Sequence, residues 1–287
     1  MLQAVITGLL LGGLYALIGV GLSLIFGIVK VTNIAHGDLM IVATFFIMVI
    51  IQHIVGNIYL ALAITIVIMA ILGFLIQKFL INTVIDQGAE TAMLVMFGLS
   101  IAIKNALTLI FGAGNNALPS PVKGINFIKS ELVSISGQYA VNFIVAVVLI
   151  VGLALLMDKT PLGRSIRAAS SDTMAAELMG INTKSMYVWA MAITMGATAV
   201  AGMLVGQTYS FFPYTGTQFL IIAFGVVVIG GMGSIFGTLI GGAILGMAQM
   251  IAAYFLGTAY QTLAGYVILL ILLTVRPQGL LSKKMRK

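Results

Sequence analysis

The sequence contains no cysteine among its 287 residues. It therefore cannot form a disulfide or a cysteine-ligated metal site, and it holds no thiolate nucleophile. Charge is also scarce, since 7% of the residues are charged, whereas about 25% is usual in soluble domains. Hydrophobic residues make up 61% of the chain, in runs longer than a buried core helix needs. The composition predicts an all-α polytopic membrane protein.

The sequence also lacks the patterns typical of catalysis. The phosphate-binding pattern G-x-x-x-x-G-K-[ST] is absent, and the glycine-rich residues 230–237 hold no lysine to reach a phosphate. The two histidines, His36 and His53, have no carboxylates at ligand spacing and so indicate no metal site. There is no Ser-His-Asp set and no paired-carboxylate set. We therefore expect no catalytic residue, no metal ligand and no cofactor bound by this chain.

The few charges indicate how the chain crosses the membrane. The formal net charge is +7, but the basic residues lie between apolar runs and at the C-terminal end. We interpret this excess as membrane topology and not as nucleic-acid binding. Lys and Arg in short loops are retained in the cytoplasm. This rule places residues 158–184 and the C-terminus in the cytoplasm and the N-terminus outside.

The apolar runs predict about nine spans of roughly 20 residues each, with eight or ten as alternatives. The N-terminal run carries no basic leader or cleavage site, which favours a retained first span over a signal peptide. Some spans are expected to be broken at glycine-rich points. The expected spans are residues 4–29, 39–55, 58–77, 91–112 and 139–157, then up to four within 185–275. The expected loops are residues 78–90 in the cytoplasm and 113–138 outside, and the later breaks are expected at 212–216, 230–234 and 257–258.

Residues 158–184 form the one long polar segment between apolar runs. Pro161 suits the first turn of a helix, roughly 161–170. Ser170, Ser171 and Asp172 supply N-cap chemistry for a second helix that runs through Met179, and Gly180 would end it. Two interpretations of the charges remain open. They either solvate and anchor a cytoplasmic loop, or they form the surface that a soluble partner grips.

Several motifs occur in order along the chain. They are GLYAL at 13–17, TNIAHGD at 32–38, PLGRSIRA at 161–168, GGMGS at 230–234 and RPQGL at 276–280. With these motifs the sequence resembles the permease subunits, of the kind called LivH, of ATP-binding-cassette (ABC) importers for branched-chain amino acids. The resemblance implies the ABC importer permease fold, with residues 1–287 as a single transmembrane permease domain. It also implies the transport of amino acids, with branched-chain amino acids as the first expectation.

In that family the central loop carries the coupling helix that docks on the ATPase, and the resemblance transfers this role to residues 160–181. The wider importer group has Glu-Ala-Ala, three residues and then Gly, whereas Met174 stands at the Glu position here. The implied docking residues are Arg164, Arg167, Asp172, Ala175, Ala176, Glu177 and Gly180.

The same resemblance implies several partners. They are two ABC ATPase subunits that hold ATP and Mg²⁺, a second, related permease subunit and a soluble substrate-binding protein. The implied location is a bacterial cytoplasmic (inner) membrane, and the implied mechanism is alternating access, driven by the ATPases.

Polar groups at membrane depth would mark a translocation pathway. Asn33, His36 and Asp38 form the densest cluster. They either line the inner end of the pathway or form an interfacial turn whose Asn and Asp cap the second span. For Lys104 we favour a side chain that reaches the membrane interface over a charge in the pathway. The candidate pathway residues are Asn33, His36, Asp38, Gly230, Gly231, Gly233 and Ser234.

Other functions remain open from the residues alone. One is an ion-coupled secondary transporter or a channel for a small polar solute. A secondary transporter would more often carry intramembrane Asp, Glu or His, and only Lys104 is expected to lie deep. Another is an integral-membrane enzyme, which the missing catalytic set disfavours. The amino acid transported is not indicated, because a broken helix can hold a substrate carboxylate without any charged side chain.

Overall fold

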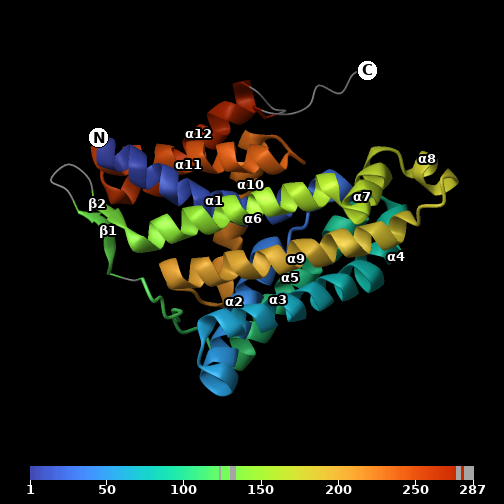
Figure 1. Cartoon of the computed structure of the whole chain (residues 1–287), viewed down its shortest axis with the longest axis horizontal. Coiled ribbons are helices and arrows are strands. Elements are labelled where there is room, and N and C mark those ends of the chain that lie inside the picture. Colours follow the sequence, from blue (N-terminus) through green and yellow to red (C-terminus); the bar gives the residue numbers. More distant parts are fainter. Residues whose placement is uncertain (123, 130–133, 276–278, 281–287) are drawn as a thin grey trace. The chain divides into compact units, whose positions relative to one another are not determined.

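The computed structural model describes residues 1–122, 124–129, 134–275, 279 and 280. The described chain is helical apart from one two-stranded hairpin and short connections (Figure 1). Its contacts divide it into two compact units. Unit 1 comprises Met1–Ser23, Ser120–Gly152 and the described residues of Ile221–Lys287. Unit 2 comprises Leu24–Pro119 and Leu153–Leu220.

The described residues hold nine helical stretches that are long and apolar enough to cross a membrane. The prediction of about nine spans is therefore confirmed. The stretches are Leu2–Val29, His36–Val55, Ile58–Gln87, Ala89–Phe111, Gly137–Lys159, Thr183–Thr208, Pro213–Gly230, Ile235–Leu256 and Thr258–Val275. The predicted breaks between the last four of these stretches are confirmed as well.

Unit 1 is organised by close contacts along α1 (Leu2–Val29). A Cβ built on Gly12 would lie 2.6 Å from the Ala243 Cα of α11 (Ile235–Leu256). A Cβ built on Gly8, one turn away on α1, would overlap the backbone of the same helix. Small residues at this spacing let helix backbones approach closely. Tyr15 adds a buried hydrogen bond, because its hydroxyl donates to Gln249 Oε1 of α11 at 2.6 Å.

The rest of unit 1 surrounds this helix pair. Its other elements are β1 (Asn126–Lys129), β2 (Ser134–Ser136), most of α6 (Gly137–Lys159), most of α10 (Gly216–Gly230), the 3-10 turn η5 (Thr258–Tyr260) and α12 (Gln261–Val275). The strands pair antiparallel, and the Gln3 side chain of α1 bonds both backbone groups of Ser134. The loop predicted at 113–138 therefore contains a hairpin. Lys123 and Glu131 of that loop, and Arg276 and residues 281–287 of the basic C-terminal end, lie outside the described residues.

Unit 2 is built around α9 (Thr183–Thr208), most of which is buried. Figure 1 shows α9 running beside α3 (Ile58–Leu75), and α2 (His36–Ile50) packs on it as well. The other elements are the π-helical turns η1 (Ile51–Val55) and η2 (Ile76–Ile81), α4 (Asn82–Val84), the 3-10 turns η3 (Ile85–Gln87) and η4 (Pro213–Thr215), α5 (Ala89–Phe111), α7 (Pro161–Ser171) and α8 (Thr173–Leu178). A Cβ on Gly202 of α9 would lie 2.7 Å from the Met40 carbonyl oxygen of α2.

The loop predicted at 78–90 is wrong over most of its length. The helix that begins at Ile58 continues through η2, α4 and η3 to Gln87, and Gly88, with φ of 112°, separates it from α5. Charged residues suggested a loop, yet neither Gly nor Pro occurs between Lys78 and Gln87 to break a helix. Lys78 Nζ lies 5.7 Å from the centroid of the Phe74 ring. This cation–π contact accommodates the lysine charge within the helix.

We expect Gly12→Ala to lower the free energy of unfolding by about 1–3 kcal/mol, because the new methyl group overlaps the α11 backbone. Alanine favours helix by up to about 1 kcal/mol over glycine, so overpacking must outweigh this gain. Gly98→Ala is the matched control, since a Cβ there meets nothing within 4 Å. Thermal unfolding in detergent, followed by size-exclusion chromatography, measures both. Equal melting temperatures for the two variants would contradict the close approach of α1 and α11.

Candidate functional site

The first turns of two helices, α2 and α10, meet in unit 2. α2 starts at His36, and η4 leads into α10 at Gly216. A Cβ on Gly37 would overlap the Gly216 carbonyl, and a Cβ on Gly216 would lie 2.7 Å from the Asp38 Cα. η4 also packs against α5. Glycine at both positions therefore lets the first turns of α2 and α10 touch, beside α5.

A buried charged group lies at this junction. Asp38 is 1% exposed, and its Oδ2 accepts a hydrogen bond from Ser100 Oγ at 2.5 Å. The same Oδ2 lies 3.5 Å from Lys104 Nζ. Ser100 and Lys104 are one turn apart on α5, so their side chains share a face. Asp38 is thereby held between a hydroxyl and an ammonium group.

The position of this group along α5 follows from its partner. Ser100 is the central residue of the 23-residue helix α5, so it lies about 16 Å from either end at about 1.5 Å per residue. Asp38 therefore lies beside the middle of α5, although it is in the first turn of α2. α2 thus begins half-way along a helix that is long and apolar enough to cross a membrane.

Two expectations about these residues are wrong. Asp38 does not cap the second span, because α2 has Ala35 at its N-cap without a side-chain cap bond. Lys104 does not reach the interface, because its ammonium pairs with Asp38. Both errors have one cause. The sequence gives no sign that α2 starts half-way along α5, and this start brings the two charges together.

Further buried polar atoms lie close by in the chain. Asn33 is 1% exposed, and neither Oδ1 nor Nδ2 of its amide has a hydrogen-bond partner among the described residues. Oδ1 of Asp38 has none either. His36 is buried to the same degree. The structure therefore buries all three predicted residues of the cluster at the start of α2. Sequence reasoning missed Ser100, whose only signal is a polar residue one turn before Lys104 in an apolar span.

The four glycine-rich candidates occupy a turn in unit 1. α10 ends at Gly230, and Gly231 and Gly233 have positive φ of 101° and 82°. Ser234 caps α11 by accepting the Gly237 amide at 3.0 Å. These four residues form a tight interhelical turn, and a role for them in the pathway remains a prediction.

The polar segment of unit 2 folds as predicted. Pro161 stands in the first turn of α7, and Asp172 caps α8 by accepting the Ala175 amide at 3.0 Å. Gly180 has φ of 82°, in the left-handed region that favours glycine at a helix end. The two short helices and the stop at Gly180 are thereby confirmed.

Most of the implied docking residues are engaged within their own unit. Arg167 pairs with Asp158, Asp172 is the cap, and Ala176 is buried. Arg164 and Ala175 are exposed. Several of the seven implied residues therefore help to build the helix pair, although all except Ala176 remain exposed. A role for them in docking remains a prediction.

Three large apolar side chains are also exposed on α8 and at its C-cap. Met174, Leu178 and Met179 are 75%, 83% and 82% exposed. We name these three residues the apolar patch. Sequence reasoning missed this patch because it interpreted the segment through its charged residues. The available signal was three large apolar side chains within one turn or so of each other on a segment outside the membrane.

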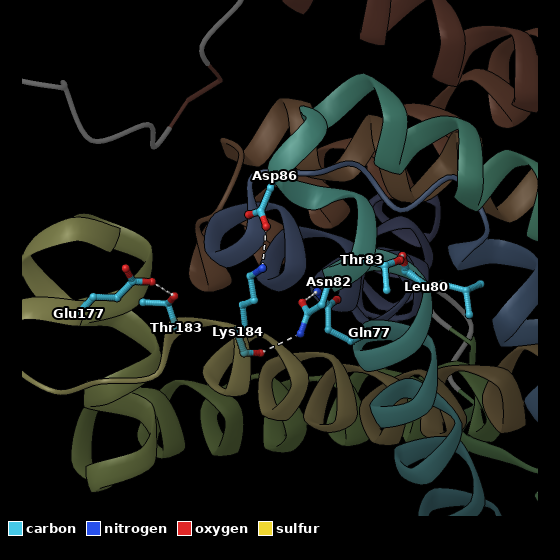
Figure 2. A network of polar contacts seen from close by, with 8 residues as sticks. All are labelled: Gln77, Leu80, Asn82, Thr83, Asp86, Glu177, Thr183 and Lys184. Carbon is cyan, nitrogen blue, oxygen red and sulfur yellow. Dashed lines mark hydrogen bonds and ion pairs between the residues drawn. The ribbon is translucent and has the colours of Figure 1, made fainter.

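Figure 2 shows how α8 is tied to the helices beneath it. The Thr183 hydroxyl donates to Glu177 Oε1 at 2.6 Å, which joins the end of α8 to the start of α9. Lys184 Nζ lies 2.6 Å from Asp86 Oδ2, and Asn82 Nδ2 donates to the Lys184 carbonyl at 3.1 Å. α8, α9 and the end of the Ile58–Gln87 helix are therefore one connected group.

The network continues towards α3 through Gln77, whose Nε2 donates to Asn82 Oδ1 at 2.9 Å. Gln77 belongs to the π-helical turn η2. Such turns are common at functional sites, where they change the register of a helix. α8 is thus linked directly to α9 and, through Lys184, Asn82 and Gln77, to the helix that continues from α3.

Comparison with known proteins decides the family. The sequence model described as "Branched-chain amino acid transport system / permease component" matches residues 4–275. The chain belongs to this permease family. The permease is 32% identical to the high-affinity branched-chain amino acid transport system permease protein LivH of Escherichia coli (strain K12), over 98% of this chain and 96% of that protein.

Two further relatives agree. The permease is 30% identical to the permease protein BraD of a high-affinity branched-chain amino acid transport system in Pseudomonas aeruginosa, over 98% of this chain and 96% of that protein. It is 28% identical to the probable branched-chain amino acid transport permease protein LivH of Methanocaldococcus jannaschii, over 96% of this chain and 90% of that protein. No solved structure matches it. The resemblance drawn from the motifs is therefore confirmed at the level of the family.

We expect Ser100→Ala to lower the free energy of unfolding of the permease by about 1.5–3 kcal/mol, because a buried carboxylate loses a hydrogen-bond donor. Thr108→Val is the matched control on the same helix, since the Thr108 hydroxyl bonds only the backbone carbonyl of Lys104. Denaturant unfolding in detergent compares the two. A smaller effect at Ser100 than at Thr108 would refute the bond to Asp38.

Proposed function

We propose that this permease is the transmembrane subunit of an ABC importer for branched-chain amino acids in a bacterial cytoplasmic membrane. Its partners are two ABC ATPase subunits that bind ATP and Mg²⁺, a second, related permease subunit and a soluble substrate-binding protein. The chain itself binds no cofactor. The observation that carries the proposal is the family match over residues 4–275, together with the apolar patch on a helix pair outside the membrane.

The apolar patch is the proposed dock for the ATPase. Side chains such as Leu178, which is 83% exposed, are unfavourable in water and typical of the desolvated centre of an interface. Arg164 of the neighbouring helix α7 is an exposed charge that the same partner could also contact. The basic residues of 158–184 and of the C-terminus support a cytoplasmic position for both segments, where an ATPase could reach the patch.

The proposed mechanism is alternating access. ATP-driven movement of the ATPases displaces α8, and the Glu177–Thr183 and Lys184–Asp86 contacts carry this displacement to α9 and to the end of the Ile58–Gln87 helix. α2 packs on α9, so the junction at Asp38 moves in turn. Rocking of packed helices around a fixed central site is a general mode of transport.

A second function is favoured by one observation. Asp38 is a carboxylate beside the middle of α5, and intramembrane carboxylates often couple transport to an ion gradient. An ion-coupled secondary transporter would need no ATPase. The two functions therefore differ in their energy source, which can be measured.

Uptake of leucine into proteoliposomes tests the proposed function. The complete assembly should take up leucine with the binding protein outside and ATP inside. Uptake should vanish without the ATPase subunits and persist when ionophores collapse the ion gradients. Uptake by this chain alone that collapses with the gradients would instead establish the secondary transporter.

A second prediction concerns the dock. Changing Met174, Leu178 and Met179 together to Ser should weaken ATPase association at least tenfold, which is about 1.4 kcal/mol, because the interface loses its apolar centre. The matched control is the combined Met174→Leu, Leu178→Met and Met179→Leu variant, which keeps size and apolarity. Co-purification and titration with the ATPase give the affinities. Unchanged association of the Ser variant would exclude the patch as the dock.

A further inference from the structure

We propose that Asp38 and Lys104 form a transient binding site for the zwitterionic head of the transported amino acid. The substrate ammonium would replace Lys104 at the Asp38 carboxylate, and the substrate carboxylate would pair with the released Lys104 ammonium. This inference rests on the proposed function and adds the residues that the substrate touches within this chain.

The first argument is the cost of the pair. Two charges beside the middle of α5 must be taken out of water, and apolar residues of similar volume often serve folding equally well or better. Asp38 is 1% exposed and Lys104 is 19% exposed. Ionisable groups within membrane-spanning segments commonly belong to a substrate or ion pathway. A purely structural role would not need both charges.

The second argument is that the pair is loose. The Lys104 Nζ to Asp38 Oδ2 distance is 3.5 Å, whereas charge-assisted N–H···O bonds are about 2.7–2.9 Å. Ser100 holds the same oxygen at 2.5 Å and would keep the carboxylate in place when the lysine leaves. Lys104 has a long, flexible side chain and retains some exposure, so it can move while Asp38 stays fixed.

The third argument is the unused hydrogen-bonding capacity of Asp38 itself and of Asn33, five residues before it in the chain. Asp38 Oδ1 and both amide atoms of Asn33 are buried without a hydrogen-bond partner among the described residues. Native proteins rarely leave such atoms unbonded, because each one costs free energy. An ammonium group could bond Asp38 Oδ1.

The fourth argument is electrostatic, and it favours an amino acid over a simple ion as the ligand. A zwitterion inserted between Asp38 and Lys104 leaves every charge at the site paired. A lone cation at Asp38 would leave the half-buried Lys104 ammonium without a counter-charge, which is costly. The first turns of α2 and α10, which meet at Gly37 and Gly216, add a positive dipole end that favours carboxylates nearby. The site therefore suits a neutral solute with both charges.

The test uses the complete assembly with Asp38→Asn, Lys104→Met and the double variant. The readouts are assembly, ATP hydrolysis stimulated by the loaded binding protein, and leucine uptake. Each variant should assemble, retain ATP hydrolysis within about twofold and lose uptake at least tenfold, so that uptake per ATP falls. The double variant should remain as inactive in uptake as the single ones. Thr108→Val, on the same helix, is the control and should transport normally.

The double variant makes the test decisive, because it removes both charges together and leaves no unpaired one to unfold the chain. If the pair served structure alone, the double variant would regain uptake that either single variant loses. Such recovery, or a loss of uptake that only matches a loss of assembly, would overturn the proposal. A failure of the wild-type assembly to import leucine would instead count against the proposed function.

Discussion

The Asp38 carboxylate, buried beside Ser100 and Lys104, is the constraint on which the architecture of unit 2 depends. A charge beside the middle of α5 is tolerated because a hydroxyl, an ammonium group and the first turns of two helices surround it. That arrangement requires the backbones of α2 and α10 to touch at Gly37 and Gly216. Any larger residue at either position would separate the helices and leave the charge without its surroundings.

Close backbone contact at glycine is the common packing device in both units. α1 meets α11 at Gly8 and Gly12 in unit 1, and α9 meets α2 at Gly202 in unit 2. Within a membrane no hydrophobic force drives helices together, so dispersion contacts between closely packed backbones must do so. At the start of α9 in unit 2, a polar network takes the place of glycine contacts. There Lys184 and Asp86 join α9 to the long helix that begins at Ile58. The buried junction and the apolar patch are thus connected through packed helices.

The sequence predicted the spans and the helix pair well, because both are local properties. Apolar length sets the spans, and Pro161, Asp172 and Gly180 set the short helices. It failed where the result depends on distant residues. The pairing of Asp38 with Lys104 needs α2 to start half-way along α5, and no local pattern encodes this. The loop expected at 78–90 failed because charge was taken as a break, although a helix that leaves the membrane can carry charge.

The candidate site divides in the same way. Asn33, His36 and Asp38 could be selected from the sequence because polar residues are rare in apolar surroundings. The apolar patch could not be selected by that criterion, because Met174 and Leu178 are ordinary in a chain that is 61% hydrophobic. Their place in the polar segment 158–184 and their exposure distinguish them. The most direct test of the whole account is a structure of the assembled transporter determined with leucine during turnover. The account predicts leucine with its ammonium on Asp38 and its carboxylate on Lys104, whereas an intact Asp38–Lys104 pair with leucine bound elsewhere would contradict it.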